Sequence, residues 1–180
     1  MAVLIGAVVV VGALCLLDLL LTFGVIRRLR EHTEMLARMQ HGGTDVIGLP
    51  AGKAPESFTA TDNEGVAVRG PSGLSVVAFF STTCSVCPKR APAFTDYARE
   101  HLVGRHEVLA VVVGQATQSV PYLADLTEVA RVCAEPPDGP IGRAFAVQGY
   151  PVFFALDAGG TVLWSGYDPS ALPAPSRSLT

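Results

Sequence analysis

The chain has 180 residues, which suffices for one ordinary domain with an additional segment and excludes a large multidomain enzyme. Hydrophobic residues make up 49 % of it and charged residues 16 %, and the mean hydropathy is +0.40. This composition excludes a disordered chain and indicates that part of the chain lies in lipid. A net charge of -3, without a long Lys or Arg run, excludes nucleic acid as an expected partner.

The first predicted element is a membrane-spanning helix over residues 2–26. The segment has one ionisable side chain, Asp18, and at about 1.5 Å per helical residue it exceeds the roughly 30 Å hydrocarbon core. It begins without Lys or Arg and ends before an arginine cluster that starts at Arg27, which favours a retained anchor over a cleaved signal peptide. Asp18 is expected to pair in the membrane or lie near an interface, and Cys15 to be a small buried hydrophobe.

Residues 27–53 are predicted to form a juxtamembrane helix followed by a linker. Mostly apolar side chains recur at alternating steps of four and three between residues 25 and 39, which gives the helix a seam along one face. The seam fits a dimer contact, a helix lying along the membrane or a continuation of the anchor. His41-Gly42-Gly43 ends the helix, and the Gly and Pro residues up to Pro55 are typical of a linker.

A globular domain is predicted from residue 54 to residue 167. It opens with a hairpin whose turn contains Asn63 and Gly65. The expected elements are strands at 57–60 and 66–68, a buried strand at 74–80, a helix at 88–101, a buried strand at 107–113, a helix at 120–128, a short strand at 129–133, a helical turn at 142–146 and a closing hairpin at 152–156 and 161–164. This order predicts an α/β fold. Residues 168–180 are predicted to form an unstructured tail.

The chemistry is expected at the motif Cys84-Ser85-Val86-Cys87, between a buried strand and a helix. Free N–H groups and the helix dipole favour a thiolate at the first sulfur, so Cys84 is the predicted catalytic nucleophile. Cys87, one turn later and less exposed, is predicted to attack the mixed disulfide and release the product. The pair could instead be half of a zinc site, but Cys133 and the histidines offer no second paired-ligand spacing. No metal or other cofactor is therefore expected, and Cys133 is expected to be a buried strand residue.

Three stretches carry a resemblance to a known family: Gly52-Lys53-Ala54-Pro55 with Phe58, residues 77–87, and residues 147–154. They resemble the thioredoxin superfamily, and within it the membrane-anchored TlpA-like group and the MauD-like accessory proteins of methylamine utilisation. The resemblance implies a thioredoxin-like fold, a central mixed sheet flanked by helices, acting as a thiol–disulfide oxidoreductase. It implies that Pro151 is a cis-proline beside the disulfide and that the backbone of Tyr150 pairs with a substrate strand near Cys84.

The sequence departs from thioredoxin at several positions. Ala78 stands where thioredoxin has a buried acid that moves protons, so proton transfer must use water or another group. Thr83 replaces a tryptophan, and Ser85-Val86 replaces Gly-Pro, which leaves the direction of electron flow undetermined. Prolines interrupt the usual terminal helix, so one face of the sheet is expected to be thinly covered.

Two other function classes are considered for this domain. A thiol peroxidase would carry Thr or Ser three residues before its reactive cysteine and Pro seven before; Ser81 meets the first requirement and Val77 fails the second. A non-catalytic assembly or metal-delivery factor could use the same fold to hold a client, with His101 and His106 as conceivable ligands.

The expected partners are the thiols or disulfides of a client protein and a redox partner. The arginines after the span place the domain in the cytoplasm by the positive-inside rule. The resemblance implies the opposite side, where disulfides persist. We follow the resemblance and expect a single-pass cell-membrane protein whose thioredoxin-like domain lies outside the cytoplasm.

Overall fold

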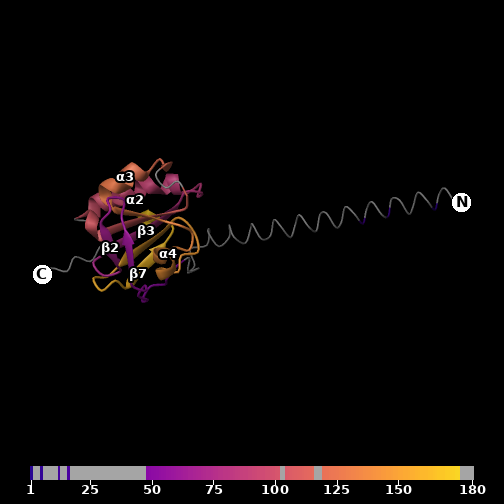
Figure 1. Ribbon diagram of the computed structural model, residues 1–180. Coiled ribbons are helices and arrows are strands. Elements are labelled where there is room, and N and C mark those ends of the chain that lie inside the picture. Colours follow the sequence, from indigo (N-terminus) through magenta and orange to yellow (C-terminus); the bar gives the residue numbers. More distant parts are fainter. Residues whose placement is uncertain are drawn as a thin grey trace. The chain divides into compact units, whose positions relative to one another are not determined.

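The structure is a computed structural model that describes residues 48–101, 104–115 and 119–174, together with Met1, Ile5, Gly12 and Leu16 (Figure 1). The chain divides into two compact units, Met1–Asp45 and Val46–Thr180. No helix in the part of the chain so described is long and apolar enough to cross a membrane. Apart from Ile5, Gly12 and Leu16, the predicted span, with Cys15 and Asp18, lies outside the described residues, as does the predicted juxtamembrane helix.

The second unit is built on a five-stranded mixed sheet with the strand order β5-β4-β3-β6-β7. The strands are β3 (Val76–Ser81), β4 (Val108–Val113), β5 (Arg131–Glu135), β6 (Val152–Leu156) and β7 (Val162–Gly166). Strands β3, β4 and β5 are parallel, whereas β6 runs antiparallel to β3 and β7 antiparallel to β6. Every residue of β3, β4 and β6 is buried, as their nearly continuous apolar sequences predict.

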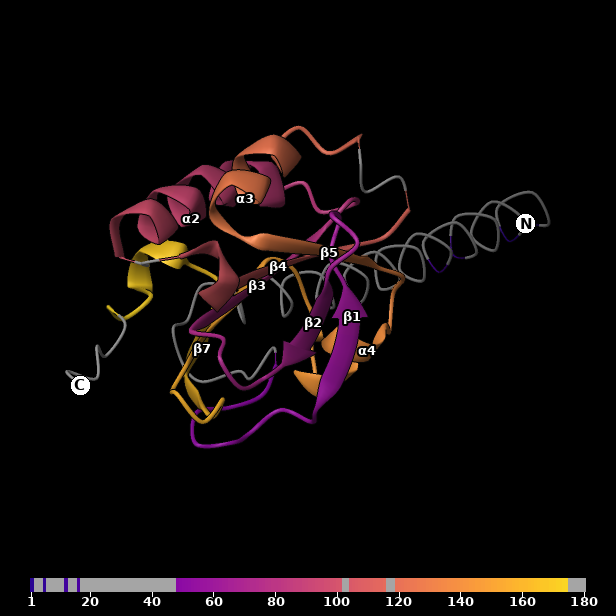
Figure 2. The same ribbon diagram turned by 60° about the vertical axis from the view of Figure 1, so that its left-hand side comes forward.

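Other elements cover both faces of this sheet (Figure 2). The elements on one face are α2 (Cys87–His101), α3 (Leu123–Val129) and the 3-10 turn η3 (Pro169–Ala171). Those on the other are α4 (Pro140–Ala144) and the hairpin of β1 (Phe58–Thr61) and β2 (Ala67–Gly70). A short 3-10 turn, η1 (Arg105–Glu107), leads from α2 into β4. This arrangement confirms the expected thioredoxin-like α/β fold.

Alternate residues of β3 belong to two different hydrophobic cores, one on each face of the sheet. Successive side chains of a strand point to opposite faces, so Phe79 and Phe80 belong to different cores. The ring of Phe80 lies 5.8 Å from that of Phe94 on α2, and the ring of Phe79 lies 5.5 Å from that of Phe145 after α4. The central strand thereby anchors both layers directly before the Cys-x-x-Cys motif.

The predicted elements agree with the observed ones to within three residues at each end. The helix expected at 120–128 begins at Leu123, and the helical turn expected at 142–146 is found at Pro140–Ala144. β5 is displaced by two residues at both ends. The strand was expected at 129–133 and is found at Arg131–Glu135. The reason is that α3 continues to Val129 and that the strand ends on a buried acid, Glu135, whose charge gave no sign of a core position.

The chain joins the folded unit earlier than the predicted residue 54. The N–H of Leu49 donates to the carbonyl of Phe145 at 2.8 Å, and that of Gly52 to the carbonyl of Val162 at 2.8 Å. In return, the N–H of Val162 donates to the carbonyl of Lys53 at 2.9 Å. Residues 49–53 are therefore part of the domain and not of the predicted linker, because Leu49 bonds to the residue after α4 and residues 52–53 bond to the outer edge of β7.

The β1–β2 hairpin is fixed to β5 through its turn. The Asp62 carboxylate accepts a hydrogen bond from Arg131 Nε at 3.1 Å and two from N–H groups of its own turn, at 2.8 and 3.1 Å. Only 3 % of the Asp62 side chain is exposed. The N–H of Asn63 donates to the carbonyl of Val132 at 2.8 Å. A buried ion pair and a backbone bond thus join the hairpin to the outer edge of the sheet.

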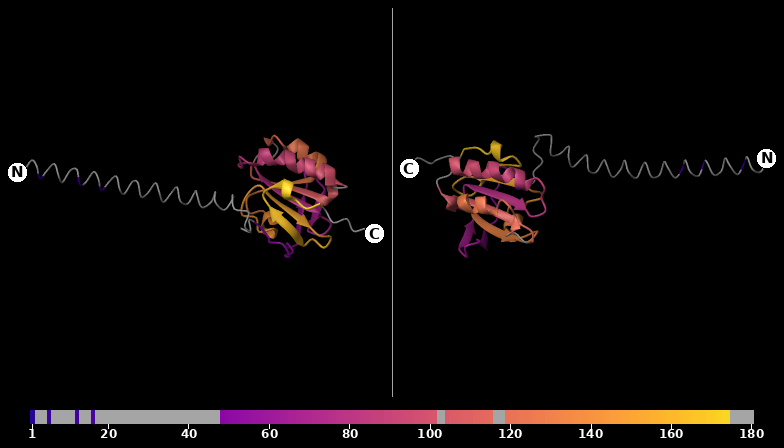
Figure 3. Two further views of the ribbon diagram at one scale, coloured as in Figure 1. Left: turned by 180° about the vertical axis from the view of Figure 1, so that it is seen from behind. Right: turned by 90° about the horizontal axis from the view of Figure 1, so that it is seen from above.

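The C-terminal segment packs on the domain as far as Pro173, in contrast to the tail expected from residue 168. Figure 3 shows the yellow turn of η3 beside α2. Leu172 is buried in the core between α2 and the sheet, and the Tyr97 hydroxyl donates to the carbonyl of Pro173 at 2.7 Å. Asp168 pairs with Arg90 of α2 at 2.9 Å. This turn takes the place of the usual terminal helix, so the face is covered more fully than expected.

Replacing Leu172 with alanine is expected to lower the free energy of unfolding by about 2 kcal/mol, because a buried leucine side chain leaves a cavity against α2. Urea unfolding of the full chain, followed by tryptophan fluorescence, measures the change. Leu163→Ala is the matched control, since Leu163 on β7 is 47 % exposed. Equal effects of the two substitutions would show that the C-terminal segment adds nothing to stability.

Candidate active site

The loop after β3 places the first cysteine at the start of α2. The N–H of Thr82 donates to the carbonyl of Val113 on β4 at 3.0 Å, and the N–H of Cys84 donates to the carbonyl of Ser81 at 3.2 Å. The hydroxyls of Ser81 and Thr83 lie 3.2 Å apart and hydrogen bond to each other. The loop is therefore tied both to the sheet and to itself, which holds Cys84 in place.

The two cysteines of the motif differ in burial. Cys84 is half-buried, whereas Cys87, the first residue of α2, is 0 % exposed. The N–H of Cys87 donates to Cys84 Sγ at 3.1 Å. The first N–H of the helix thus points at the outer sulfur, which is the arrangement predicted for a nucleophile at a helix N-terminus.

The inner thiol is held in its neutral form. Burial, with a further contribution from the neighbouring Cys84 sulfur, raises the pKa of Cys87 well above its usual value. Tyr122, at the start of α3, is a second buried group near the pair: its hydroxyl donates to the carbonyl of Ser81 at 3.4 Å. Burial raises the pKa of Tyr122, and the two cysteine sulfurs, where ionised, raise it further. No pattern in the sequence points to Tyr122, since a lone tyrosine before a helix is usually part of the core.

The residues expected to bind substrate lie against Cys84. The peptide bond between Tyr150 and Pro151 is cis, as the resemblance implied. Cys84 Sγ donates to the carbonyl of Tyr150 at 3.5 Å, and Pro151 is buried directly before β6. The structure therefore brings together Cys84, Cys87, Tyr150 and Pro151, which come from the two segments of the sequence that were expected to meet.

Other residues considered from the sequence lie away from the pair. Cys133 is buried in the core on the opposite face of the sheet, and burial raises its pKa to about 11. His101 ends α2, about 20 Å along the helix from Cys87, and stacks on Tyr97; His106 lies beyond it in η1. The described residues contain no group of three or more His, Cys, Asp or Glu side chains that could hold a metal ion.

Glu135 is a buried acid that the sequence did not single out. Its carboxylate accepts hydrogen bonds from the N–H groups of Ile141 at 3.0 Å and Gly142 at 2.8 Å, and so fixes the start of α4. Burial raises the pKa of Glu135, and these two hydrogen bonds only partly oppose the rise. This contact spans six to seven residues across a loop, a spacing that no local helix-capping pattern predicts.

The difference in burial predicts the order in which the thiols react. A limiting amount of iodoacetamide at pH 7 is expected to label Cys84 before Cys87, because Cys87 is inaccessible and neutral at that pH. Peptide mass spectrometry of the reduced chain measures the order, and the urea-unfolded chain, in which the preference should vanish, is the control. Earlier labelling of Cys87 would reverse the assigned roles.

Comparison with solved structures identifies the fold as that of thioredoxin. A putative thiol:disulfide interchange protein DsbE from Chlorobium tepidum matches with a TM-score of 0.52 and 22 % identity, covering 68 % of this chain and 89 % of that one. The thioredoxin domain of a thiol-disulfide oxidoreductase from Bacteroides vulgatus matches with a TM-score of 0.54 and 16 % identity, covering 67 % and 90 %.

A secreted Mycobacterium tuberculosis disulfide oxidoreductase homologous to E. coli DsbE also matches, with a TM-score of 0.50 and 23 % identity, covering 64 % of this chain and 87 % of that one. No protein-family model matches the sequence, and no curated protein matches it. At these identities the structural likeness establishes the fold, and the function must be argued from the site.

Proposed function

We propose that this chain is a membrane-anchored thiol–disulfide oxidoreductase, TlpA-like and MauD-like, that makes, reduces or reshuffles disulfides in a partner protein during its maturation. The observation that carries the proposal is the asymmetric pair at the start of α2. The outer sulfur, Cys84, receives the first helical N–H and lies 3.5 Å from the carbonyl of Tyr150, while Cys87 is fully buried behind it. The names of the structural neighbours support the same chemistry.

The exchange uses two steps and two electrons. The Cys84 thiolate attacks one sulfur of a client disulfide, so that a mixed disulfide forms and the first client thiolate leaves. Cys87 then gives up its proton and attacks the Cys84 sulfur, which releases the second client thiolate and leaves a Cys84–Cys87 disulfide. The client is reduced and the chain oxidised by two electrons; the reverse sequence oxidises a client dithiol.

The burial of Cys87 makes the resolving step depend on a proton transfer. A neutral inner thiol does not attack until it loses its proton, so removal of the Cys87 proton must precede the resolving step. Ala78 offers no carboxylate to accept this proton. One buried polar group near the pair is the Tyr122 hydroxyl, which donates to the carbonyl of Ser81.

The anchor and the location of the domain belong to the same proposal. The apolar segment 2–26 supports a single membrane span, and the resemblance supports a domain outside the cytoplasm, where client disulfides persist. A reporter that is active on only one side of the membrane, fused to Thr180, tests this placement. Activity of a cytoplasm-specific reporter would overturn it and support the positive-inside count.

Reversible oxidation of the full chain in detergent tests the enzymatic part. Glutathione disulfide is expected to remove both thiols of the motif from reaction with a polymer-linked maleimide, and dithiothreitol to restore them, as seen by a gel shift. Mass spectrometry should assign the bond to Cys84 and Cys87. A chain whose two thiols remain reactive in excess glutathione disulfide would contradict the proposal.

A further inference from the structure

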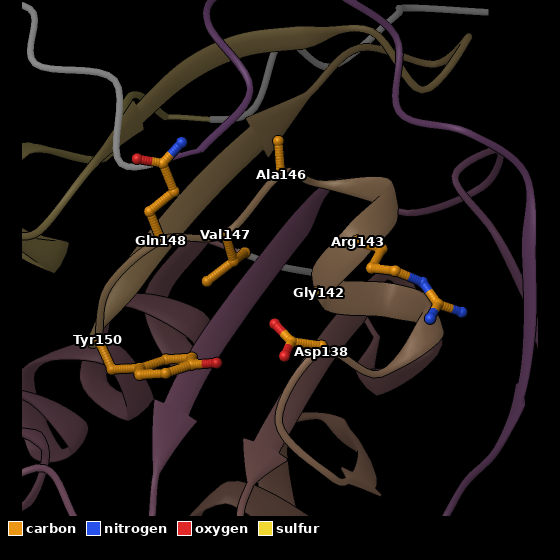
Figure 4. A pocket seen from close by; sticks show the side chains of 7 residues that line it. All are labelled: Asp138, Gly142, Arg143, Ala146, Val147, Gln148 and Tyr150. Atoms are coloured by element: carbon orange, nitrogen blue, oxygen red, sulfur yellow. The ribbon is translucent and has the colours of Figure 1, made fainter.

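Beside Tyr150 the structure forms an open pocket of about 280 Å³ (Figure 4). Asp138, Gly142 and Arg143 line it from the α4 side, and residues 146–148 and Tyr150 close it. The Tyr150 carbonyl lies 3.5 Å from Cys84 Sγ, so one residue contributes both to the exchange site and to the pocket wall. Small-molecule sites usually occupy about 300–1,000 Å³. The pocket lies at the small end of this range and has room for one long side chain.

The walls of the pocket are formed in advance of any ligand. Buried Glu135 holds the start of α4, and the N–H of Val147 donates to the carbonyl of Gly142 at 2.9 Å. Two lining residues that flank α4, Asp138 and Ala146, have left-handed backbones with φ of 60° and 49°. Such conformations are unfavourable for residues other than glycine and persist where surrounding contacts impose them, commonly at binding sites.

The chemistry of the pocket favours a cation. The Asp138 carboxylate and the Tyr150 phenol point toward one another, and the Arg143 guanidinium points away from both (Figure 4). Burial and then the negative charges of Glu135 and Asp138 raise the pKa of Tyr150, which places a negative field at its hydroxyl. A cationic group would meet the Asp138 carboxylate and the Tyr150 phenol oxygen together.

We propose that this pocket binds a Lys or Arg side chain of the client close to the cysteine that exchanges with Cys84, an inference that rests on the proposed function. An extended client paired with the Tyr150 backbone advances about 3.3 Å per residue, which puts the basic residue within about two positions of its cysteine. Asp138 pairs with the charge and the Tyr150 ring contacts the stem. The site thus selects among client cysteines by what flanks them.

Synthetic peptides test this selection on the reduced full chain in detergent. Each peptide carries one cysteine in a disulfide with thionitrobenzoate, and Lys, Gln or Glu at one of the two positions on either side. Cys84 attacks the peptide sulfur and thionitrobenzoate leaves, so its absorbance gives the rate. Each rate is divided by that of the same peptide with 2-mercaptoethanol, which removes differences in intrinsic reactivity.

At one of these positions the Lys peptide is expected to react about fivefold faster than the Gln peptide, and the Glu peptide more slowly, as one partly exposed ion pair allows. Asp138→Asn should bring the three rates together, and asparagine tolerates the left-handed backbone of this position. Asp125→Asn on α3 removes an equal charge from an exposed site outside the pocket and should leave the preference unchanged.

Equal rates for the three peptides in the unmodified chain, faster reaction of the Glu peptide, or a preference that survives Asp138→Asn would each overturn the inference. Hydroxyethyl disulfide separates this failure from failure of the proposed function. If the chain reduces hydroxyethyl disulfide but does not distinguish the peptides, only the pocket inference fails. If it reduces neither, the proposed function fails and the pocket inference fails with it.

Discussion

Cys84→Ser is expected to abolish disulfide exchange, whereas Cys87→Ser should accumulate a mixed disulfide with the client. Serine at 84 removes the sulfur that lies against the Tyr150 carbonyl. Among the described residues, the only other cysteine on that face of the sheet is the buried Cys87. Serine at 87 keeps the attacking sulfur and removes the resolving one. Non-reducing gels and mass spectrometry of proteins cross-linked in cells expressing each variant measure the difference.

Cys133→Ala is the matched control for these substitutions. It removes a thiol that lies in the core on the opposite face of the sheet, so exchange should continue at the unmodified rate. Trapping of clients by Cys84→Ser, or loss of exchange in Cys133→Ala, would show that the roles of the three thiols are assigned incorrectly.

Asp62→Ala is expected to lower the free energy of unfolding by about 3 kcal/mol. The substitution leaves the Arg131 side chain, which is 20 % exposed, without its buried partner, and frees two N–H groups of the hairpin turn. Urea unfolding of the full chain measures the loss. Asp125→Ala, at an exposed position of α3, should have little effect, and an equally small effect of Asp62→Ala would contradict a structural role for the pair.

The same ion pair gives the stability a defined pH dependence. Burial alone would raise the pKa of Asp62, but hydrogen bonds from Val66, Arg131 and Glu64 outweigh it and lower the pKa below its ordinary value of 3.8. The stabilisation is therefore complete above about that value and is lost as the pH falls through the lower pKa of the folded chain. The stability difference between the unmodified chain and Asp62→Ala should shrink in that acidic range.

The sheet, the Cys-x-x-Cys motif and the Tyr150 segment beside it could be predicted because each has a local signal or a signal from the family resemblance. Continuous apolar runs marked β3, β4 and β6, and the Cys-x-x-Cys motif marked the start of α2. The meeting of Cys84 with Tyr150 across 66 residues followed from the family resemblance alone, since no local pattern states which loops lie together.

What the sequence did not predict consists of long-range contacts made by polar or isolated residues. Glu135 and Asp62 are acids in positions that composition rules assign to the surface, and each is buried because distant N–H or guanidinium groups pair with it. Leu172 lies in a proline-interrupted segment without periodicity, so its packing on α2 had no signal. The left-handed residue Asp138 precedes Gly139-Pro140, which marks a loop but not a pocket.

The two outer strands of the sheet also bear on how the chain avoids aggregation. Strands as apolar as β3, β4 and β6 are prone to stack between molecules, and an open sheet edge gives them a template. Here residues 52–53 occupy backbone groups at the β7 edge, and the turn of the β1–β2 hairpin occupies one at the β5 edge. Segments that precede the redox motif in the sequence therefore cover part of each edge of the sheet, so their loss should open both edges to intermolecular strand pairing.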